Sequence, residues 1–138
     1  MKTTDELLNI LKNKDIHNYF KENPDEFVKN PLSDYLNKML AEKNLTISEA
    51  AKNANMFNIY VYQIFSGKKN PSRDKLIQLC FGLNTDFEEV QSILKHSGNA
   101  PLYPRNKRDS IIISAFINKL PLMKCNELLD EENFSPLT

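Results

Sequence analysis

The sequence of 138 residues contains little glycine and little cysteine. Its three glycines, Gly67, Gly82 and Gly98, are scattered, which excludes a glycine-rich phosphate loop and a dinucleotide-binding fingerprint. The two cysteines, Cys80 and Cys125, lie far apart and fit neither a disulfide framework nor a cluster of metal ligands. We therefore expect two free thiols in a reducing compartment.

Long apolar runs and net charge are also missing. No apolar run approaches the roughly 18 residues of a membrane span, and residues 1–10 lack the apolar core of a signal peptide. Eighteen Lys and Arg residues balance eighteen Asp and Glu residues, so bulk charge does not predict a protein that coats nucleic acid. With 41% apolar residues the chain can bury a core, and we expect a soluble, cytoplasmic protein.

The usual constellations of catalysis are absent as well. His17 and His96 are solitary, without Cys, Asp or Glu at metal-ligand spacing. The acidic residues at 88–89 suit the start of a helix, and those at 130–132 belong to an acidic terminal stretch. Because no Ser/His/Asp or Cys/His arrangement can be drawn, we expect no enzymatic activity, no metal and no cofactor.

Apolar residues recur at helical spacing through most of the chain, while no alternating pattern is long enough for a strand. The sequence therefore predicts an all-α fold. A first helix capped by Thr4 and a weaker segment at 24–31 precede a stronger pattern that ends at Asn44 in a left-handed cap. Two further helices are expected at 106–118 and 122–131.

The central segment shows two capping-box patterns, in which a side chain at the helix start and a glutamate exchange hydrogen bonds with backbone N–H groups. One is Thr46-Ile47-Ser48-Glu49 and the other is Thr85-Asp86-Phe87-Glu88. Between them we expect a helix over 57–66, closed by Gly67, and another whose entry is set by Pro71. Counted from the helix that ends at Asn44, these are the third and fourth helices. Five short helices, with a tight turn between the second and third, are typical of a helix-turn-helix unit.

The expected third helix has two different faces. Phe57, Val61, Ile64 and Phe65 fall on one side, where we expect them to enter the core. The other side carries amide, phenol and apolar groups with hardly any charge: Asn58, Ile59, Tyr62, Gln63 and Ser66. Asn and Gln can bond adenine in pairs, and an apolar group such as Ile59 can contact a thymine methyl. This face is a candidate for reading DNA bases.

Basic residues follow this face directly in the sequence. Lys68, Lys69 and Arg73 can hold phosphates. The helix starts near Thr46 and Ser72 can add backbone N–H groups. A plain solvated loop is the alternative. The predicted phosphate contacts are Thr46, Ser66, Lys68, Lys69, Ser72 and Arg73.

Two segments, LTISEAA at 45–51 and VYQIFSGKKNPS at 61–72, resemble the Cro/C1-type (Xre family) helix-turn-helix of phage repressors and bacterial regulators. The resemblance covers about 32–94, and its most specific part is the Ser-Gly-Lys-x-x-Pro closure. It implies a five-helix DNA-binding bundle at 31–98. The remaining residues, 1–30 and 99–138, would be helical extensions.

The resemblance also implies which residues read bases: Asn58, Ile59, Tyr60, Tyr62 and Gln63. Three positions depart from the family pattern. Asn55 replaces the usual turn glycine, and Ile47 replaces a polar residue that contacts phosphate. Phe65 replaces a glutamate, which indicates an apolar neighbour on that side.

We therefore expect a sequence-specific regulator of double-stranded DNA, a repressor of bacterial or phage origin. It would act as a homodimer on half-sites roughly 34 Å apart. The alternative is a protein-interaction module on the same scaffold, such as an antitoxin or adaptor, using the third helix and the 101–138 extension. Ile47, Ile59, Tyr60 and Tyr62 favour this alternative, because they are more apolar than a DNA reader requires.

The zero net charge is a sum of unequal parts. Residues 58–75 carry +3 and residues 101–124 carry +4, whereas residues 125–138 carry −4. The cluster of Arg105, Lys107 and Arg108 could be a plain surface loop, or it could contact a phosphate backbone or an acidic partner. The extension also has an apolar face that could hold a dimer together or fold back on the core: Ile111, Ile112, Ala115 and Phe116.

Overall fold

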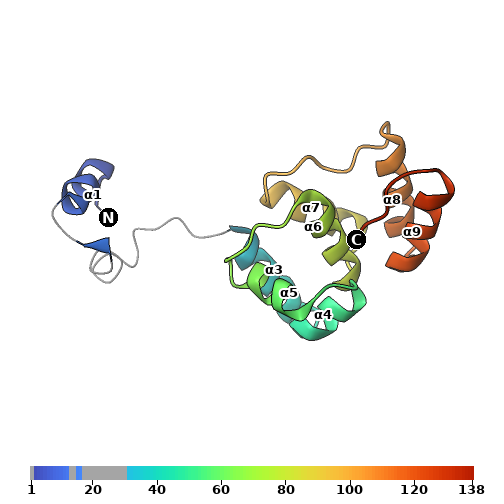
Figure 1. Cartoon of the computed structure of the whole chain (residues 1–138), viewed down its shortest axis with the longest axis horizontal. Helices are drawn as coiled ribbons and strands as arrows, with labels where there is room; N and C mark the ends of the chain where they lie inside the picture. Colours follow the sequence, from blue (N-terminus) through green and yellow to red (C-terminus); the bar gives the residue numbers. More distant parts are fainter. Residues whose placement is uncertain (1, 13–14, 17–30) are drawn as a thin grey trace.

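The computed structural model describes residues 2–12, 15–16 and 31–138. These residues form helices and no strand, which confirms the predicted all-α class (Figure 1). The helices are α1 (Thr4–Leu11), α3 (Pro31–Glu42), α4 (Ile47–Asn53), α5 (Asn58–Phe65), α6 (Arg73–Gly82), α7 (Phe87–His96), α8 (Lys107–Ile117) and α9 (Leu122–Glu131). His17 and the weaker segment predicted up to residue 30 lie outside the described residues.

Helix α1 stands apart from the other helices in Figure 1 and buries none of its residues. Its cap is Thr3, whose hydroxyl accepts a hydrogen bond from the Glu6 N–H at 3.2 Å. The prediction that Thr4 caps this helix was therefore wrong by one residue. Leu8 and Leu11 on α1 remain exposed, so α1 adds nothing to the core that the other helices share.

Left-handed residues end several helices where the sequence predicts them. Asn44, with a φ of 53°, follows α3, and Gly67, with a φ of 82°, follows α5. Asn55, which replaces the usual turn glycine, has a φ of 52° in the turn between α4 and α5. Asparagine adopts this conformation more readily than most residues, so the turn forms without glycine.

The two expected capping boxes form differently from the prediction. The box of α7 consists of Asp86 and Glu89, one residue later than expected, with N–H to carboxylate distances of 2.8 and 2.9 Å. Thr85 instead donates its hydroxyl to a carbonyl of α6. At α4, Thr46 accepts the Glu49 N–H at 3.1 Å, but the Glu49 carboxylate accepts the Thr46 hydroxyl rather than its backbone N–H. Only half of that box forms.

Helix α4 packs against α5 on one side and against α6 on the other. The approach to α6 is close at Gly82, where an added Cβ would collide with the carbonyl oxygen of Ala50 and come within 2.8 Å of the Ala54 Cβ. Glycine is therefore required at this crossing. Helix α3 completes the bundle by packing against α5 and α7.

The C-terminal extension folds back on this bundle, which is one of the two arrangements its apolar face allows. Ile112, Ala115 and Phe116 are buried in the same core as the helix-turn-helix residues. Phe116 stacks on Phe81 of α6, with ring centroids 4.1 Å apart. Leu137, the penultimate residue, is also fully buried. The extension is thus part of the folded body, and no helix in the described ranges is long and apolar enough to cross a membrane.

Candidate nucleic-acid interface

Helix α5 buries one face, as the sequence predicts. Val61, Ile64 and Phe65 are enclosed in the core. Phe57, by contrast, is 87% exposed, so the prediction that it enters the core was wrong. The physical reason is local: Phe57 is the N-cap, with extended backbone angles, and the helical periodicity that places the other three begins only at Asn58.

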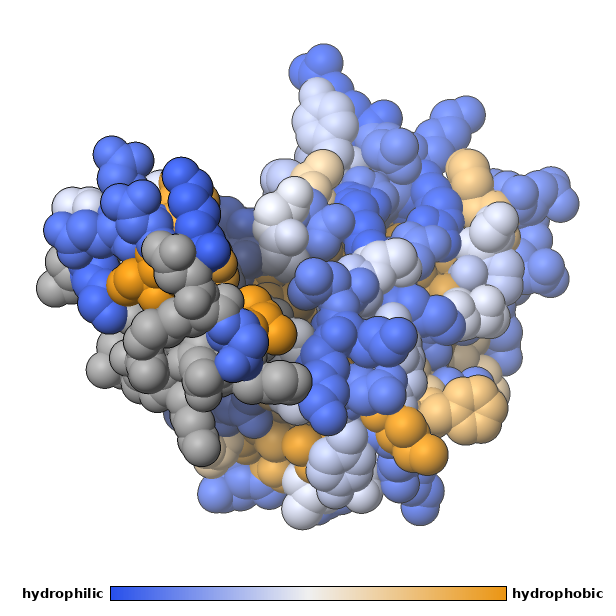
Figure 2. Space-filling view, turned by 60° about the vertical axis from the view of Figure 1, so that its left-hand side comes forward, coloured by the Kyte–Doolittle hydropathy of each residue, from blue (hydrophilic) through white to orange (hydrophobic). Residues whose placement is uncertain are grey.

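The opposite face of α5 is open. Ile59 is 75% exposed and Tyr62 is 51% exposed, while Asn58 is also on the surface. Gln63 is half-buried, and Tyr60 packs against the edge of the core. Tyr60 and Tyr62 therefore lie in different surroundings. Figure 2 shows a mostly hydrophilic surface on which hydrophobic side chains form separate small patches.

The lysine pair lies in the loop that leaves α5. The backbone N–H groups of Lys68 and Lys69 both donate to the Gln63 carbonyl, at 2.9 and 3.2 Å, so the loop turns back onto the helix end. Both lysine side chains are exposed. Ser66 is exposed too and donates its hydroxyl to the same carbonyl at 3.1 Å. Two exposed lysines thus directly follow the end of α5 in the chain.

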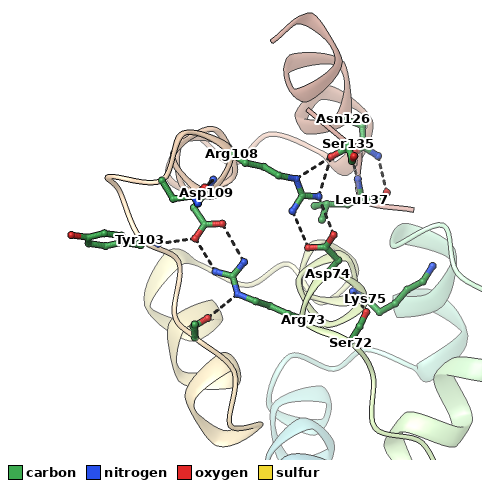
Figure 3. Close-up of polar contacts among 12 residues, drawn as sticks. Ser72, Arg73, Asp74, Lys75, Tyr103, Arg108, Asp109, Asn126, Ser135 and Leu137 are labelled. Carbon is green, nitrogen blue, oxygen red and sulfur yellow. Dashed lines mark hydrogen bonds and ion pairs between the residues drawn. The ribbon is translucent and has the colours of Figure 1, made fainter. Parts of the chain in front are cut away.

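Arg73 is used inside the fold rather than left free for phosphate. Its Nη1 and Nη2 donate to the two carboxylate oxygens of Asp109, at 3.2 and 2.8 Å (Figure 3). Its Nε and Nη2 donate to the carbonyls of Ala100 and Pro101, at 2.9 and 3.1 Å. The guanidinium therefore joins the start of α6 to the extension, which differs from the phosphate contact expected from the sequence.

A second arginine makes the mirror contact. Arg108 donates from Nη1 and Nη2 to the two oxygens of Asp74, at 2.9 and 3.0 Å, and also reaches the Ser135 carbonyl (Figure 3). One Arg-Asp dipeptide lies in α6 and one in α8, and the arginine of each binds the aspartate of the other. We call these contacts the crossed ion pairs. Of the second basic cluster, only Arg105 and Lys107 remain exposed.

The predicted phosphate residues at helix starts are where the sequence places them. Thr46 is the N-cap of α4, and Ser72 is the N-cap of α6, where its hydroxyl accepts the Lys75 N–H at 3.2 Å. Both side chains are exposed. Their hydroxyls already serve the helix ends, so any phosphate contact would add to these internal hydrogen bonds.

Gln78 has a structural role in the turn that the sequence analysis missed. Its side chain, 1% exposed, donates from Nε2 to the carbonyls of Ala54 and Asn55, at 2.8 and 3.3 Å. Gln78 thereby ties the turn between α4 and α5 to α6. A polar residue inside the apolar run of α6 was the available signal.

The end of α5 is held in a similar way by α3. The hydroxyl of Ser33 and the amide of Asn37 both donate to the carbonyl of Phe65, at 2.6 and 2.7 Å. These hydrogen bonds satisfy a carbonyl that the helix end leaves without an intrahelical partner. Helix α5 is therefore fixed at both ends, which lets its open face keep one orientation.

Neither thiol forms a reactive or metal-binding site. Cys80 and Cys125 are free and buried, as expected. Burial raises the pKa of Cys80 to about 12 and that of Cys125 to about 11. His96 stacks on Tyr35 with ring centroids 4.3 Å apart. In the part of the chain that the structure describes, His, Cys, Asp and Glu form no group of three that could hold a metal ion.

Comparison with protein-family models matches residues 36–90 to the helix-turn-helix family. The matched segment runs from α3 to the start of α7 and contains the whole α4–turn–α5 unit. Comparison with curated proteins and with solved structures gives no match. Together with the exposed, uncharged face of α5, the family match identifies residues 36–90 as belonging to the Cro/C1-type (Xre family) helix-turn-helix domains, DNA-binding domains of transcription regulators.

Proposed function

We propose that this protein is a sequence-specific repressor of bacterial or phage origin that acts in the cytoplasm and inserts α5 into the major groove of DNA. The observation that carries the proposal is the open face of α5, on which amide and apolar groups stand beside two exposed lysines. Amides and apolar groups suit base edges, whereas ammonium groups suit phosphates. The helix-turn-helix domain is itself non-enzymatic, and we propose no catalysis and no cofactor.

Different side chains on the open face would contact different parts of the bases. Asn58 and Gln63 would bond adenine edges through their amides, and Ile59 and Tyr62 would make contacts beside them. Tyr60, also expected from the sequence to read bases, packs against the core edge. Tyr60 would therefore contact a base only with the part of its side chain that the core leaves exposed.

Phosphate contacts would come from both sides of α5. Lys68 and Lys69 lie in the loop that leaves the helix, and Thr46 and Ser72 lie at the starts of α4 and α6. Each of these starts exposes backbone N–H groups that favour anions. Ser66 would join them at the end of α5. Arg73 is left out of the set because Asp109 occupies its guanidinium.

We further propose that the protein binds as a homodimer. A two-fold pair of recognition helices reads half-sites about one helical turn apart, roughly 34 Å. Helix α1 is a candidate for the contact between subunits, because Leu8 and Leu11 remain exposed among the residues that the structure describes. Light scattering of the full chain would show twice the monomer mass, and deletion of residues 1–12 would tell whether α1 holds the dimer.

The proposal is tested by selecting bound duplexes from a random DNA library with the full chain, at two salt concentrations. A single enriched sequence, with affinity falling steeply as salt rises, is the expected result. Lys38→Ala, which removes an exposed lysine of α3, is the matched control for variants that remove Lys68 or Lys69. Binding without any enriched sequence would contradict sequence-specific recognition.

The exposure of Phe57 and Ile59 supports a second candidate, a protein-interaction module such as an antitoxin or adaptor. Exposed apolar groups gathered on one element often mark a protein contact. The partner would cover α5, the 101–138 extension, or both. Absence of salt-sensitive DNA binding, together with a stoichiometric partner purified from the native host, would favour this candidate. An antitoxin that represses its own genes would satisfy both proposals.

A further inference from the structure

The open face of α5 lacks the side chains that read G·C pairs most strongly. Residues 57–66, which include both caps of the helix, contain no Arg, Lys, Asp or Glu. Arginine and lysine are the usual partners of guanine O6 and N7, and carboxylates accept from the cytosine amino group. The nearest arginine in the sequence, Arg73, is held by Asp109 and two carbonyls of the extension.

Exposed apolar groups stand at the start of the helix instead, one at its N-cap and one in its first turn. Phe57 and Ile59 are among the most exposed large hydrophobic residues of the described chain, and they flank Asn58 at the start of the helix. The C5-methyl of thymine is the one apolar group among the base edges of the major groove. A protein–DNA contact that buries these side chains would therefore gain most where thymines stand opposite them.

The amides on the open face of α5 also favour A·T pairs. Asn58 at the first position of α5 is exposed, and Gln63 lies half-buried more than one turn later. Carboxamides pair with adenine through N6 and N7. Adenine and thymine are partners, so apolar and amide groups on one helix can read alternate strands of a single A·T-rich segment.

We propose that this protein recognises an A·T-rich half-site, with Phe57 and Ile59 against thymine methyl groups and Asn58 and Gln63 on adenine edges. The inference rests on the proposed DNA-binding function and narrows its substrate to duplexes that carry thymine methyls in the major groove. Phe57 is assigned here as a specificity-determining residue, a role that the sequence analysis did not give it.

The first test is the consensus obtained by selection from random duplexes. An A·T-rich core is expected. A consensus dominated by G·C pairs would overturn the inference and leave sequence-specific DNA binding intact. Failure to enrich any sequence would instead remove the proposed function on which the inference rests.

The second test separates methyl contacts from DNA shape. Replacing the core thymines of the selected duplex by uracil keeps the base pairing and removes the C5-methyl groups. We expect wild-type affinity to fall about fourfold for each methyl that a side chain covers, as burial of one methylene-sized group implies. Unchanged affinity for the uracil duplex would overturn the methyl contact.

Variants then assign the contact to particular side chains. Phe57→Ala and Ile59→Ala should each lose the discrimination at the methyl that the side chain covers, and the double variant should bind thymine and uracil duplexes almost equally. Met123→Ala is the control, since Met123 is 74% exposed on α9 and lies outside the proposed interface. Retained discrimination in both α5 variants would overturn the assignment.

Discussion

Arg73 and Asp109, 36 residues apart in sequence, form a two-pronged ion pair with N–O distances of 3.2 and 2.8 Å. The Asp109 carboxylate is buried and also accepts the Tyr103 N–H at 3.0 Å. This pair fastens the C-terminal extension to the first turn of α6, immediately after the loop that carries the candidate phosphate-binding lysines. The extension therefore fixes the position at which α6 begins after this loop.

Substitution of Asp109 should destabilise the fold. Asp109→Asn removes the buried charge and leaves Arg73 without its counter-ion, and we expect a loss of about 2–3 kcal/mol in the free energy of unfolding. Urea unfolding measures this loss. Glu127→Gln, which breaks the exposed Lys124–Glu127 pair, is the control and should change stability by less than about 0.5 kcal/mol. Equal effects of the two substitutions would show that the crossed ion pairs are no stronger than a surface pair.

The two candidate phosphate cations, Lys69 and Arg73, should behave differently in DNA binding. Lys69→Ala should weaken binding to all sequences and reduce the slope of log affinity against log salt by about one, because one phosphate contact is lost. Arg73→Gln removes the guanidinium charge that Asp109 already neutralises, so it should lower stability and leave the salt slope unchanged. A reduced slope for Arg73→Gln, measured below its unfolding temperature, would restore Arg73 to the phosphate-binding set.

Gln63 should control base preference rather than overall affinity for DNA. Gln63→Ala should relax the preference at one base pair of each half-site, at a cost of about 1–3 kcal/mol in binding the selected sequence. Binding to unrelated duplexes should stay the same, because the substitution removes no charge. Selection repeated with the variant measures both effects. A uniform loss across all sequences would indicate that Gln63 supports the loop rather than reads a base.

The close crossing of α4 and α6 leaves no room for a side chain at Gly82. Gly82→Ala would force its Cβ against the carbonyl of Ala50, and we expect a loss of at least about 1–3 kcal/mol from overpacking. Gly98→Ala is the matched control: its Cβ meets open space, so only its φ of 75° is strained, at about 1 kcal/mol. Thermal unfolding compares the two. A milder effect at Gly82 would mean that α4 can shift away from α6.

Local signals account for the parts of the fold that the sequence predicted well. Asn44 and Gly67 mark helix ends through their own backbone preferences, and α9 has the predicted bounds. Phe57 was misplaced because helical periodicity was extended one residue before the helix begins. The pairing of Arg73 with Asp109 was not predicted because the two residues lie 36 positions apart, and no local pattern couples two Arg-Asp dipeptides at that distance.

Burial of the two thiols predicts a fall in stability at alkaline pH. Their pKa values are raised from 9.0 to about 12 for Cys80 and about 11 for Cys125, so the unfolded thiols ionise first. The stabilisation is complete below the unfolded pKa of 9.0; the loss begins as pH rises past that value and ends above the folded values, at up to about 1.4 kcal/mol per pH unit for each thiol. Urea unfolding at about pH 8 and about pH 10 should show a smaller alkaline loss for Cys80→Ala than for the wild type. Equal losses in both proteins would contradict this origin.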